Sequence, residues 1–200
     1  MERCSWCLNS EKMIRYHDEE WGVPLFDDRK QFEFLMLEVM QCGLNWNMMI
    51  EKREIFRKCF DNFDFGLIAE YDENDIMRIM STEGMVKSER KIRAVINNAV
   101  HFKEIRSEFV SFSEYLWSYS KGKSILYAGH QKGVLPAKNG LSERISMDLK
   151  KRGFKYLGPV TVYSHLSASG IINDHIENCF RYNEILKSFP TVHKRKDNEG

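Results

Sequence analysis

The chain has 200 residues, of which 42% are hydrophobic and 30% are charged. This length suits one domain with its own core, and the formal net charge of +1 neither requires nor excludes a nucleic-acid partner. The chain has no apolar stretch near the roughly 20 residues of a membrane helix, and its start, MERCSWCLNS, lacks the apolar run of a signal peptide. With five cysteines and no export signal, the sequence predicts a protein of a reducing cytoplasm that has no membrane partner.

Helical periodicity dominates the chain from its first third onward. The first apolar helix is expected to end just before Gly43, a glycine suited to the position after a C-cap. Ser88 and Ser142 are expected as N-caps, and Pro159 suits a first helical turn. The expected helices cover residues 29–43, 46–60, 72–80, 88–105, 111–119, 141–153 and 158–170.

Strand signals are too few to predict a sheet, and the sequence has no internal repeat. It therefore predicts an all-α fold, with one helical domain over residues 1–185. Residues 186–200, which end in HKRKDNEG, are expected to be a basic, disordered tail because they are polar and charged. This tail could add weak electrostatic affinity for DNA.

The turn around Gly84 joins two of the expected helices, with Met85 and Val86 as apolar anchors. The helix that follows is rich in lysine and arginine. Such a turn can present backbone amides and a helix N-terminus to a phosphate, as helix-hairpin-helix motifs do on DNA. An ordinary αα-hairpin needs the same glycine and apolar anchors, so the pattern alone leaves both interpretations open.

Glu38 lies inside the apolar segment FEFLMLEVM. Its carboxylate belongs either to a solvated stripe, which is the commoner case, or to a cavity where the charge has a purpose. Trp6, Tyr16, Trp21 and Trp46 are close to it in the sequence. Aromatic rings with one acid suit a flat, cationic ligand, although aromatic residues also serve core packing.

His175 and Cys179 in NDHIENCF are four residues apart, so on a helix both would point to the same face. Both are ligands that zinc accepts, but a structural zinc site needs about four ligands. The two residues therefore predict half of a metal site.

Several segments together resemble the DNA-3-methyladenine glycosylase I family. They are MERCSW, YHDEEWGVP, the Glu38 helix that leads into CGLNW, and RGFKYLGPVTVYSHLSASGIINDH, in the same order from residue 1 to about residue 180. The resemblance implies an all-α fold of the helix-hairpin-helix DNA glycosylase superfamily, in which a zinc ion joins the two ends of the chain.

The resemblance also completes the metal site. Cys4 and His17 match the family's N-terminal ligands, and His175 and Cys179 match its C-terminal ligands. Four protein ligands leave no position for a water molecule, so the Zn2+ is expected to be structural. Cys7 follows Cys4 in a C-x₂-C spacing and is kept as an alternative ligand.

For the pocket, the resemblance implies that the damaged base is flipped out of the duplex. Glu38 matches the carboxylate that bonds the base and is the expected catalytic residue. Tyr16 matches a polar partner and Trp46 a stacking platform, while Trp6 and Trp21 are expected to line the site.

For the DNA, Leu44 matches an apolar plug that fills the gap in the base stack, and it is expected to be exposed beside Gly43. Gly84, Lys87 and Lys91 fall in the hairpin region that is expected to contact phosphates. The chain has neither an aspartate after the hairpin nor a lysine pattern typical of a Schiff-base nucleophile. A monofunctional hydrolase of bacterial base-excision repair is therefore expected, acting as a monomer on double-stranded DNA that carries 3-methyladenine.

Two alternatives remain open at this stage. One is a non-catalytic, zinc-stabilised protein that binds damaged DNA. The other is a glycosylase shifted toward bulkier N3-alkyladenines. An intact set of Glu38, Tyr16 and Trp46 disfavours the first alternative.

Overall fold

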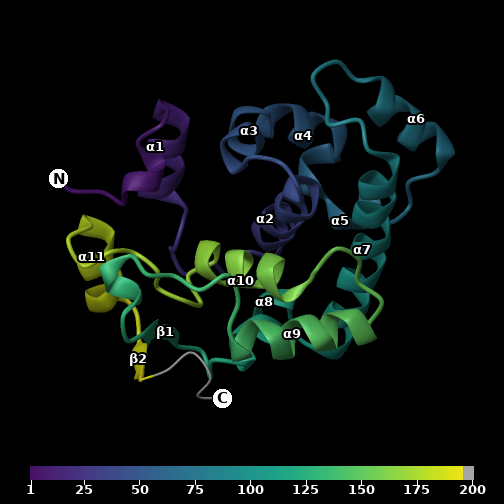
Figure 1. Ribbon diagram of the computed structural model, residues 1–200. Helices are drawn as coiled ribbons and strands as arrows, with labels where there is room; N and C mark the ends of the chain where they lie inside the picture. Colours follow the sequence, from purple (N-terminus) through teal and green to yellow (C-terminus); the bar gives the residue numbers. More distant parts are fainter. Residues whose placement is uncertain (196–200) are drawn as a thin grey trace.

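A computed structural model describes residues 1–195 of the chain (Figure 1). Most of these residues are helical, as the sequence predicted. The α-helices are α1 (Glu11–Glu19), α2 (Asp28–Gln41), α3 (Trp46–Glu51), α4 (Arg53–Cys59), α5 (Phe65–Ile68), α6 (Glu73–Ser81), α7 (Glu89–Glu108), α8 (Phe112–Ser118), α9 (Gly140–Lys151), α10 (Pro159–Ala168) and α11 (Phe180–Ser188). The strands are β1 (Ser124–Tyr127) and β2 (Thr191–Lys194), and the short 3-10 turns are η1 (Ser5–Cys7), η2 (Asp61–Phe63) and η3 (His130–Lys132).

Helix α2 is the centre of the fold. Asp27 accepts a hydrogen bond at its N-terminus, and all ten residues from 31 to 40 are buried. α2 contacts α7, α8 and α10, so apolar side chains point outward from it on every side. A helix buried all round is apolar all round, which explains why its sequence shows no clear polar stripe.

The two ends of the described chain meet. Figure 1 shows α1, near the N-terminus, and α11, near the C-terminus, on the same side of the molecule, while α5, α6 and α7 lie on the opposite side. The backbone amide of Phe180 donates to the carbonyl of Glu2, which joins the two terminal segments directly. This closure brings the first cysteine and the last cysteine of the chain into one site.

Two details of the expected helices are wrong. The segment 46–60 is two helices, because the backbone at Lys52 breaks the periodicity between α3 and α4. The cap of α9 is Asn139 rather than Ser142, and Ser142 is its partner at the third helical position in a capping box. A serine three residues into a helix can thus be mistaken for its cap.

The expectation that the chain forms no sheet is also wrong. β1 and β2 form a two-stranded parallel sheet in which Ser124 pairs with Thr191 and Tyr127 with Lys194. β1 is buried at all four positions, so it lacks the alternation by which a half-exposed strand is recognised. β2 and the end of α11 lie within the predicted disordered tail, so that prediction fails for residues 186–195; residues 196–200 lie outside the described part.

Within residues 1–195, the helices are either too short or too polar to cross a membrane.

Candidate functional site

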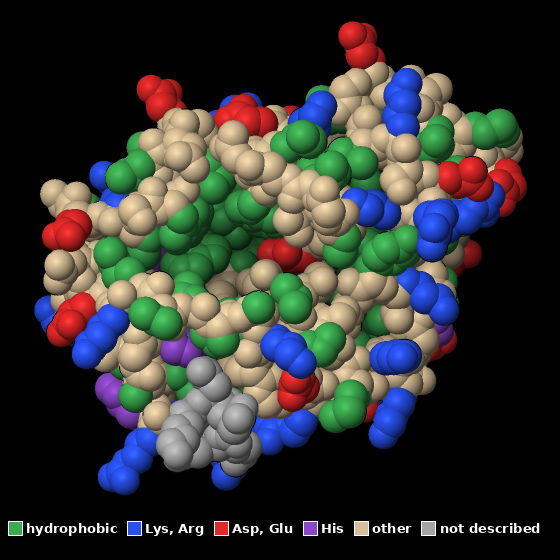
Figure 2. Space-filling model, in the orientation of Figure 1, with side chains coloured by type: hydrophobic (Ala, Val, Ile, Leu, Met, Phe, Trp, Pro, Cys, Tyr) green, Lys and Arg blue, Asp and Glu red, His purple; other side chains and the backbone are tan. Residues whose placement is uncertain are grey.

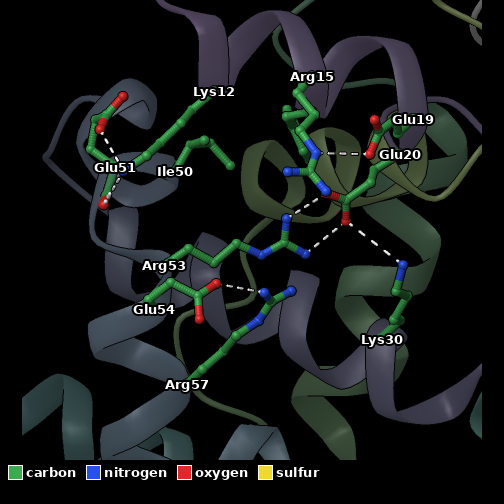
Figure 3. Close-up of a pocket in the computed structure, with 11 residues that line it drawn as sticks. Lys12, Arg15, Glu19, Glu20, Lys30, Ile50, Glu51, Arg53, Glu54 and Arg57 are labelled. Carbon is green, nitrogen blue, oxygen red and sulfur yellow. Dashed lines mark hydrogen bonds and ion pairs between the residues drawn. The ribbon is translucent and has the colours of Figure 1, made fainter.

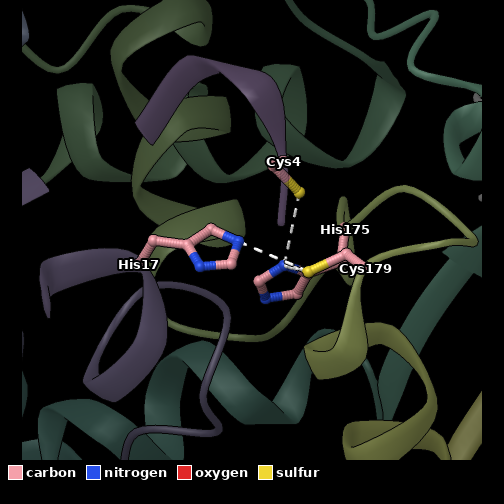
Figure 4. A group of neighbouring side chains, drawn as sticks. All are labelled: Cys4, His17, His175 and Cys179. Atoms are coloured by element: carbon pink, nitrogen blue, oxygen red, sulfur yellow. Dashed lines mark hydrogen bonds between the residues drawn. The ribbon is translucent and has the colours of Figure 1, made fainter. Parts of the chain in front are cut away.

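Four buried side chains from the two ends of the chain converge on one point (Figure 4). Their ligand atoms all lie within 4.8 Å of one another. Cys179 Sγ lies 3.4 Å from His17 Nε2 and 3.5 Å from His175 Nδ1, and Cys4 Sγ lies 3.6 Å from His175 Nδ1. The residues that the sequence predicted as metal ligands are therefore brought together.

These distances fit a tetrahedral metal. Zinc ligands at about 2.3 Å for sulfur and about 2.0–2.1 Å for nitrogen stand about 3.6 Å apart across a tetrahedral angle. The outer nitrogens are also oriented as metal-binding histidines require: His17 Nδ1 lies 2.8 Å from Asp18 Oδ1, and His175 Nε2 lies 3.2 Å from the carbonyl of Trp21. The cluster can hold a metal ion with no open coordination position.

Two sequence interpretations of this site change. His175 and Cys179 do not lie on a helix but in the turn that leads into α11, with Cys179 as the N-cap residue of that helix. The Cys7 thiol points away from the cluster and donates to the carbonyl of Cys4 at 3.1 Å. The structure therefore favours Cys4 over Cys7 as the ligand.

Gly22 shows how closely the histidine fits. Its φ is +75°, and a Cβ at this position would lie 2.6 Å from His175 Nε2. Only glycine allows the chain after α1 to pass this close to the imidazole.

Beside the cluster lies a cavity of about 280 Å³ that opens on the face between α1, α3 and α10. Figure 2 shows a hollow lined by hydrophobic side chains on this face. The cavity is lined by Trp6, Tyr16, Trp21, Glu38, Gln41, Trp46, Leu135, Tyr163, Ser164, Ser167 and Asp174. All five pocket residues that the sequence predicted are among them.

Glu38 contributes a carboxylate to this cavity that has no partner in the described part of the chain. The side chain is 6% exposed, so the solvated-stripe interpretation is wrong. Burial raises its pKa from 4.5 to about 8. Its carboxylate makes no hydrogen bond or ion pair within residues 1–195, which leaves it available to a ligand.

The Tyr16 hydroxyl faces the same cavity and is likewise buried without a hydrogen-bond partner in the described part of the chain. Its pKa is raised, mainly by burial and next by the nearby charge of Glu38. A buried polar group without a partner costs about 1–3 kcal/mol, so two in one cavity point to a ligand that satisfies both.

Aromatic rings enclose these two groups. Trp6 and Trp21 meet edge to face with ring centroids 4.9 Å apart, and Trp46 is 5.8 Å from Tyr16. Trp21 is also 4.6 Å from the ring of His175, edge to face. The metal cluster and the aromatic wall therefore share a boundary, so that binding a metal would fix the wall.

Asp174 is a second acid in the cavity that the sequence did not single out. Its carboxylate lies 2.6 Å from His130 Nδ1 and accepts hydrogen bonds from Tyr163 at 2.8 Å and Ser167 at 2.6 Å. With these three contacts it differs from Glu38, because its charge is already used within the protein. The signal in the sequence that could have identified Asp174 is its position directly before His175, a predicted metal ligand.

Leu44 is less exposed than expected. It is half-buried and packs against the main core, while Gly43 beside it is exposed with φ +80°. Leu44 thus lies in a tight turn directly after α2, between Gln41 and Trp46 in the sequence, which both line the cavity.

The predicted hairpin lies between α6 and α7. Gly84 has φ +77°, and a Cβ there would lie 2.8 Å from Ile55 Cδ1, so a glycine is required. Lys87 is exposed and makes no hydrogen bond or ion pair with the described residues. Lys91 behaves differently, because its ammonium donates to the backbone carbonyls of Met40 and Cys42.

A larger cavity of about 530 Å³ lies behind Tyr16 and is lined mainly by charged side chains (Figure 3). Arg53 contacts Glu20 and Glu33 at 2.7 Å, and Arg57 contacts Glu33 at the same distance. Burial alone would raise the pKa of Glu33, but the hydrogen bonds from both arginines hold it below its ordinary value. These paired charges make this cavity a structural ion-pair network rather than a ligand site.

Comparison with known proteins places the chain among glycosylases. The sequence model of the methyladenine glycosylases matches residues 6–182. DNA-3-methyladenine glycosylase 1 of Escherichia coli is 36% identical over 182 residues, which cover 91% of this chain and 97% of that protein. DNA-3-methyladenine glycosylase of Haemophilus influenzae is 35% identical over 177 residues, covering 88% and 96%. The structure of 3-methyladenine DNA glycosylase I from Staphylococcus aureus, solved for its recognition of 3-methyladenine, superimposes with a TM-score of 0.84 at 34% identity, covering 90% of this chain and 96% of that one.

Proposed function

The chain belongs to the methyladenine glycosylase family, and from this premise we propose that it is a DNA-3-methyladenine glycosylase that hydrolyses the N-glycosidic bond of 3-methyladenine in alkylated DNA. The observation that carries the proposal is the pair of unpartnered buried groups, Glu38 and Tyr16, in one aromatic cavity.

The pocket suits a cationic base for electrostatic reasons. The Glu38 carboxylate is the group proposed to bond the base, with Tyr16 as a second polar partner. Trp46 is proposed as the stacking platform, and Trp6 and Trp21 as the walls. Ring faces and a carboxylate favour a positively charged base over neutral adenine, which supplies discrimination without a large change in shape.

For this reaction the protein mainly has to flip the damaged nucleotide out of the duplex and position its base in the pocket. When the bond between N9 and C1′ breaks, its electron pair goes to the cationic base, which leaves as neutral 3-methyladenine. Water adds to C1′ and loses a proton, so the product strand carries an abasic site. Burial favours the protonated form of Glu38 in the empty cavity, but a cationic base beside it favours the ionised form. The resulting negative charge holds the base in place before this step, and Glu38 does not act as a nucleophile.

On the DNA side, we propose that Leu44 fills the gap left by the flipped nucleotide and that Gly43 lets this turn approach the stack. Helices α6 and α7 with the turn at Gly84 would form the helix-hairpin-helix, and Lys87 would contact a phosphate. The ammonium of Lys87 is exposed and has no ion-pair partner among residues 1–195, which supports that role. The protein is proposed to act as a monomer on double-stranded DNA in the bacterial cytoplasm.

For the metal cluster we propose Zn2+, held by Cys4, His17, His175 and Cys179. Two thiolates and two imidazoles in a closed set are typical of structural zinc. The ion would supply cross-linking of the chain ends, and no catalytic step is assigned to it.

The test of the proposal is base release. Metal-loaded protein is incubated with duplexes that contain either 3-methyladenine or a bulkier N3-alkyladenine, and free bases are separated by chromatography. Release of 3-methyladenine supports the proposal. Binding of the lesion duplex without release would instead indicate a damage-binding protein, and preferred release of the larger base would indicate a shifted specificity.

A further inference from the structure

The turn after α2, residues 42–45, carries the proposed plug and is hereafter called the plug turn. It is closed by two reciprocal hydrogen bonds. The backbone amide of Leu44 donates to the carbonyl of Gln41, and the Gln41 side-chain amide donates back to the carbonyl of Leu44 at 2.6 Å. Gln41 also lines the base cavity, so the turn and the cavity share a residue.

Lys91 reaches the same turn from a different part of the chain. It is the third residue of α7, directly after the hairpin. Its Nζ donates to the carbonyl of Met40 at 2.8 Å and to the carbonyl of Cys42 at 2.6 Å. These carbonyls belong to the C-terminal end of α2, where helix carbonyls lack intrahelical partners and the helix dipole is negative.

These two bonds use two of the three N–H groups of the ammonium. The side chain is half-buried, and desolvation lowers the pKa of Lys91. Lys87, four residues earlier in the loop before α7, is exposed and has no such contacts in the described part of the chain. The two lysines therefore have different environments, although both were predicted to contact phosphates.

The hairpin is tied to the body of the protein by a second lysine. Lys52, between α3 and α4, donates from Nζ to the carbonyl of Gly84 at 2.6 Å. The hairpin turn is thus held on one side through Gly84, and the helix that follows it holds the plug turn through Lys91. Through Lys91, a DNA contact at the hairpin would be linked to the turn that carries Leu44, the residue proposed to enter the base stack.

We propose that Lys91 is a positioning residue that fixes the plug turn and so acts on catalysis through Leu44, rather than through a phosphate; the role rests on the glycosylase function proposed above. Without the ammonium, the two carbonyls at the end of α2 lose their protein donor and the turn is free to rearrange. The plug then reaches the stack less often in the correct position.

The first experiment separates positioning from phosphate contact. Lys91→Met keeps the aliphatic stem and removes the donors, and Lys87→Met is the matched control in the loop directly before the same helix. The logarithm of the DNA-binding constant falls linearly with the logarithm of the salt concentration, and loss of one phosphate contact reduces the magnitude of this negative slope by about 0.9. We expect this for Lys87→Met, whereas Lys91→Met should keep the wild-type slope for undamaged duplex.

The second experiment is a double-mutant cycle with Leu44→Ala, in single-turnover release of 3-methyladenine. Lys91→Met is expected to lower the rate constant about 10-fold to 100-fold, as a misplaced positioning contact does, with unchanged affinity for free 3-methyladenine. Because both residues act through the plug, adding Lys91→Met to Leu44→Ala should cost less than about 3-fold more. Lys91→Arg, which can donate to both carbonyls, should recover most of the rate.

Two outcomes overturn the proposal. One is a salt dependence for Lys91→Met whose slope decreases in magnitude as much as that of Lys87→Met. The other is full additivity of Lys91→Met and Leu44→Ala. Both leave wild-type base release intact, so failure of this inference is distinct from failure of the glycosylase function. If Lys91→Met melts below the assay temperature, Lys91→Gln, which can still donate to one carbonyl, replaces it in the same cycle.

Discussion

At the scale of single residues, α2 carries two buried carboxylates in opposite electrostatic situations. Glu33 has two arginine partners, and Glu38 has no partner among the described residues. Burial raises the pKa of Glu38 to about 8, whereas ion pairing holds the pKa of Glu33 low. The contrast separates a carboxylate that stabilises the fold from one that is available to a ligand.

This difference predicts how stability depends on pH. Since the pKa of Glu38 rises from 4.5 to about 8 on folding, the folded protein keeps a proton between these pH values that the unfolded chain has lost. The Glu38 contribution to stability therefore falls as pH rises through this window. Glu38→Gln should match wild type near the lower limit and exceed its free energy of unfolding by about 5 kcal/mol above the upper limit. Urea unfolding at several pH values measures this.

Glu33→Gln is the control on the same helix. It removes a carboxylate whose pKa is lowered in the folded state, so it should lower the free energy of unfolding near neutral pH and lose its effect in acid. A Glu38→Gln variant that is less stable than wild type at alkaline pH would contradict the assigned environment of Glu38.

The sequence could not decide between the two roles of Glu38, because ten consecutive buried residues leave no polar stripe from which to infer its direction. The sequence offered Glu38 and the nearby aromatic residues as pocket candidates, but the role of each came from the family resemblance. Asp174 was missed because its function in the pocket wall depends on His130, Tyr163 and Ser167, which approach it only in the folded chain.

At the scale of elements, the hairpin depends on one glycine. Gly84→Ala places a Cβ 2.8 Å from Ile55 Cδ1 at a position with φ +77°. Gly122→Ala is the matched control, since its φ of +69° is similar and no atom lies within 4 Å of the added Cβ. We expect about 1 kcal/mol of destabilisation at Gly122, from the backbone alone, and about 2–3 kcal/mol at Gly84.

Only Gly84→Ala should also weaken binding to undamaged DNA, because only that variant displaces the hairpin. Thermal melts and fluorescence anisotropy with a labelled duplex check the two effects. Equal loss of DNA affinity in both variants would contradict a specific role for the hairpin.

Where the sequence predicted a helix, its ends were right to within a few residues, because apolar periodicity and caps are local; α1, α5 and α11 were not predicted. The break at Lys52 and the pairing of β1 with β2 were not predictable, since both depend on contacts between distant parts of the chain. β2 has the polar composition of a tail, and only its pairing with β1 makes it a strand.

At the scale of the whole molecule, a metal ion bound by the cluster of Cys4, His17, His175 and Cys179 would close a loop that contains almost the entire domain. Cys4 and Cys179 lie at its two ends, and the backbone of Trp21 orients His175. A cross-link of this span restricts the unfolded chain and also fixes the aromatic wall. Only the half with His175 and Cys179 was predictable from the residue types, whereas Cys4, His17 and the convergence of the two halves came from the family resemblance.

Cys4→Ser should therefore lose the metal, whereas Cys7→Ser should keep it, because the Cys7 thiol bonds the Cys4 carbonyl and not the cluster. Loss of the cross-link should lower the free energy of unfolding by about 3 kcal/mol, or the melting temperature by about 6–12 °C. Metal analysis of the purified variants and thermal melts measure both. Full metal content in Cys4→Ser would reverse the ligand assignment.

The most direct test of the central claim is single-turnover release of 3-methyladenine from a duplex with one lesion, comparing metal-loaded wild type with Glu38→Gln. The expected result is free 3-methyladenine from wild type, an intact abasic strand, and a rate lowered about 100-fold in Glu38→Gln through loss of the carboxylate charge. No release by metal-loaded wild type, or equal rates for the two proteins, would contradict the assignment of the chemistry to the Glu38 pocket.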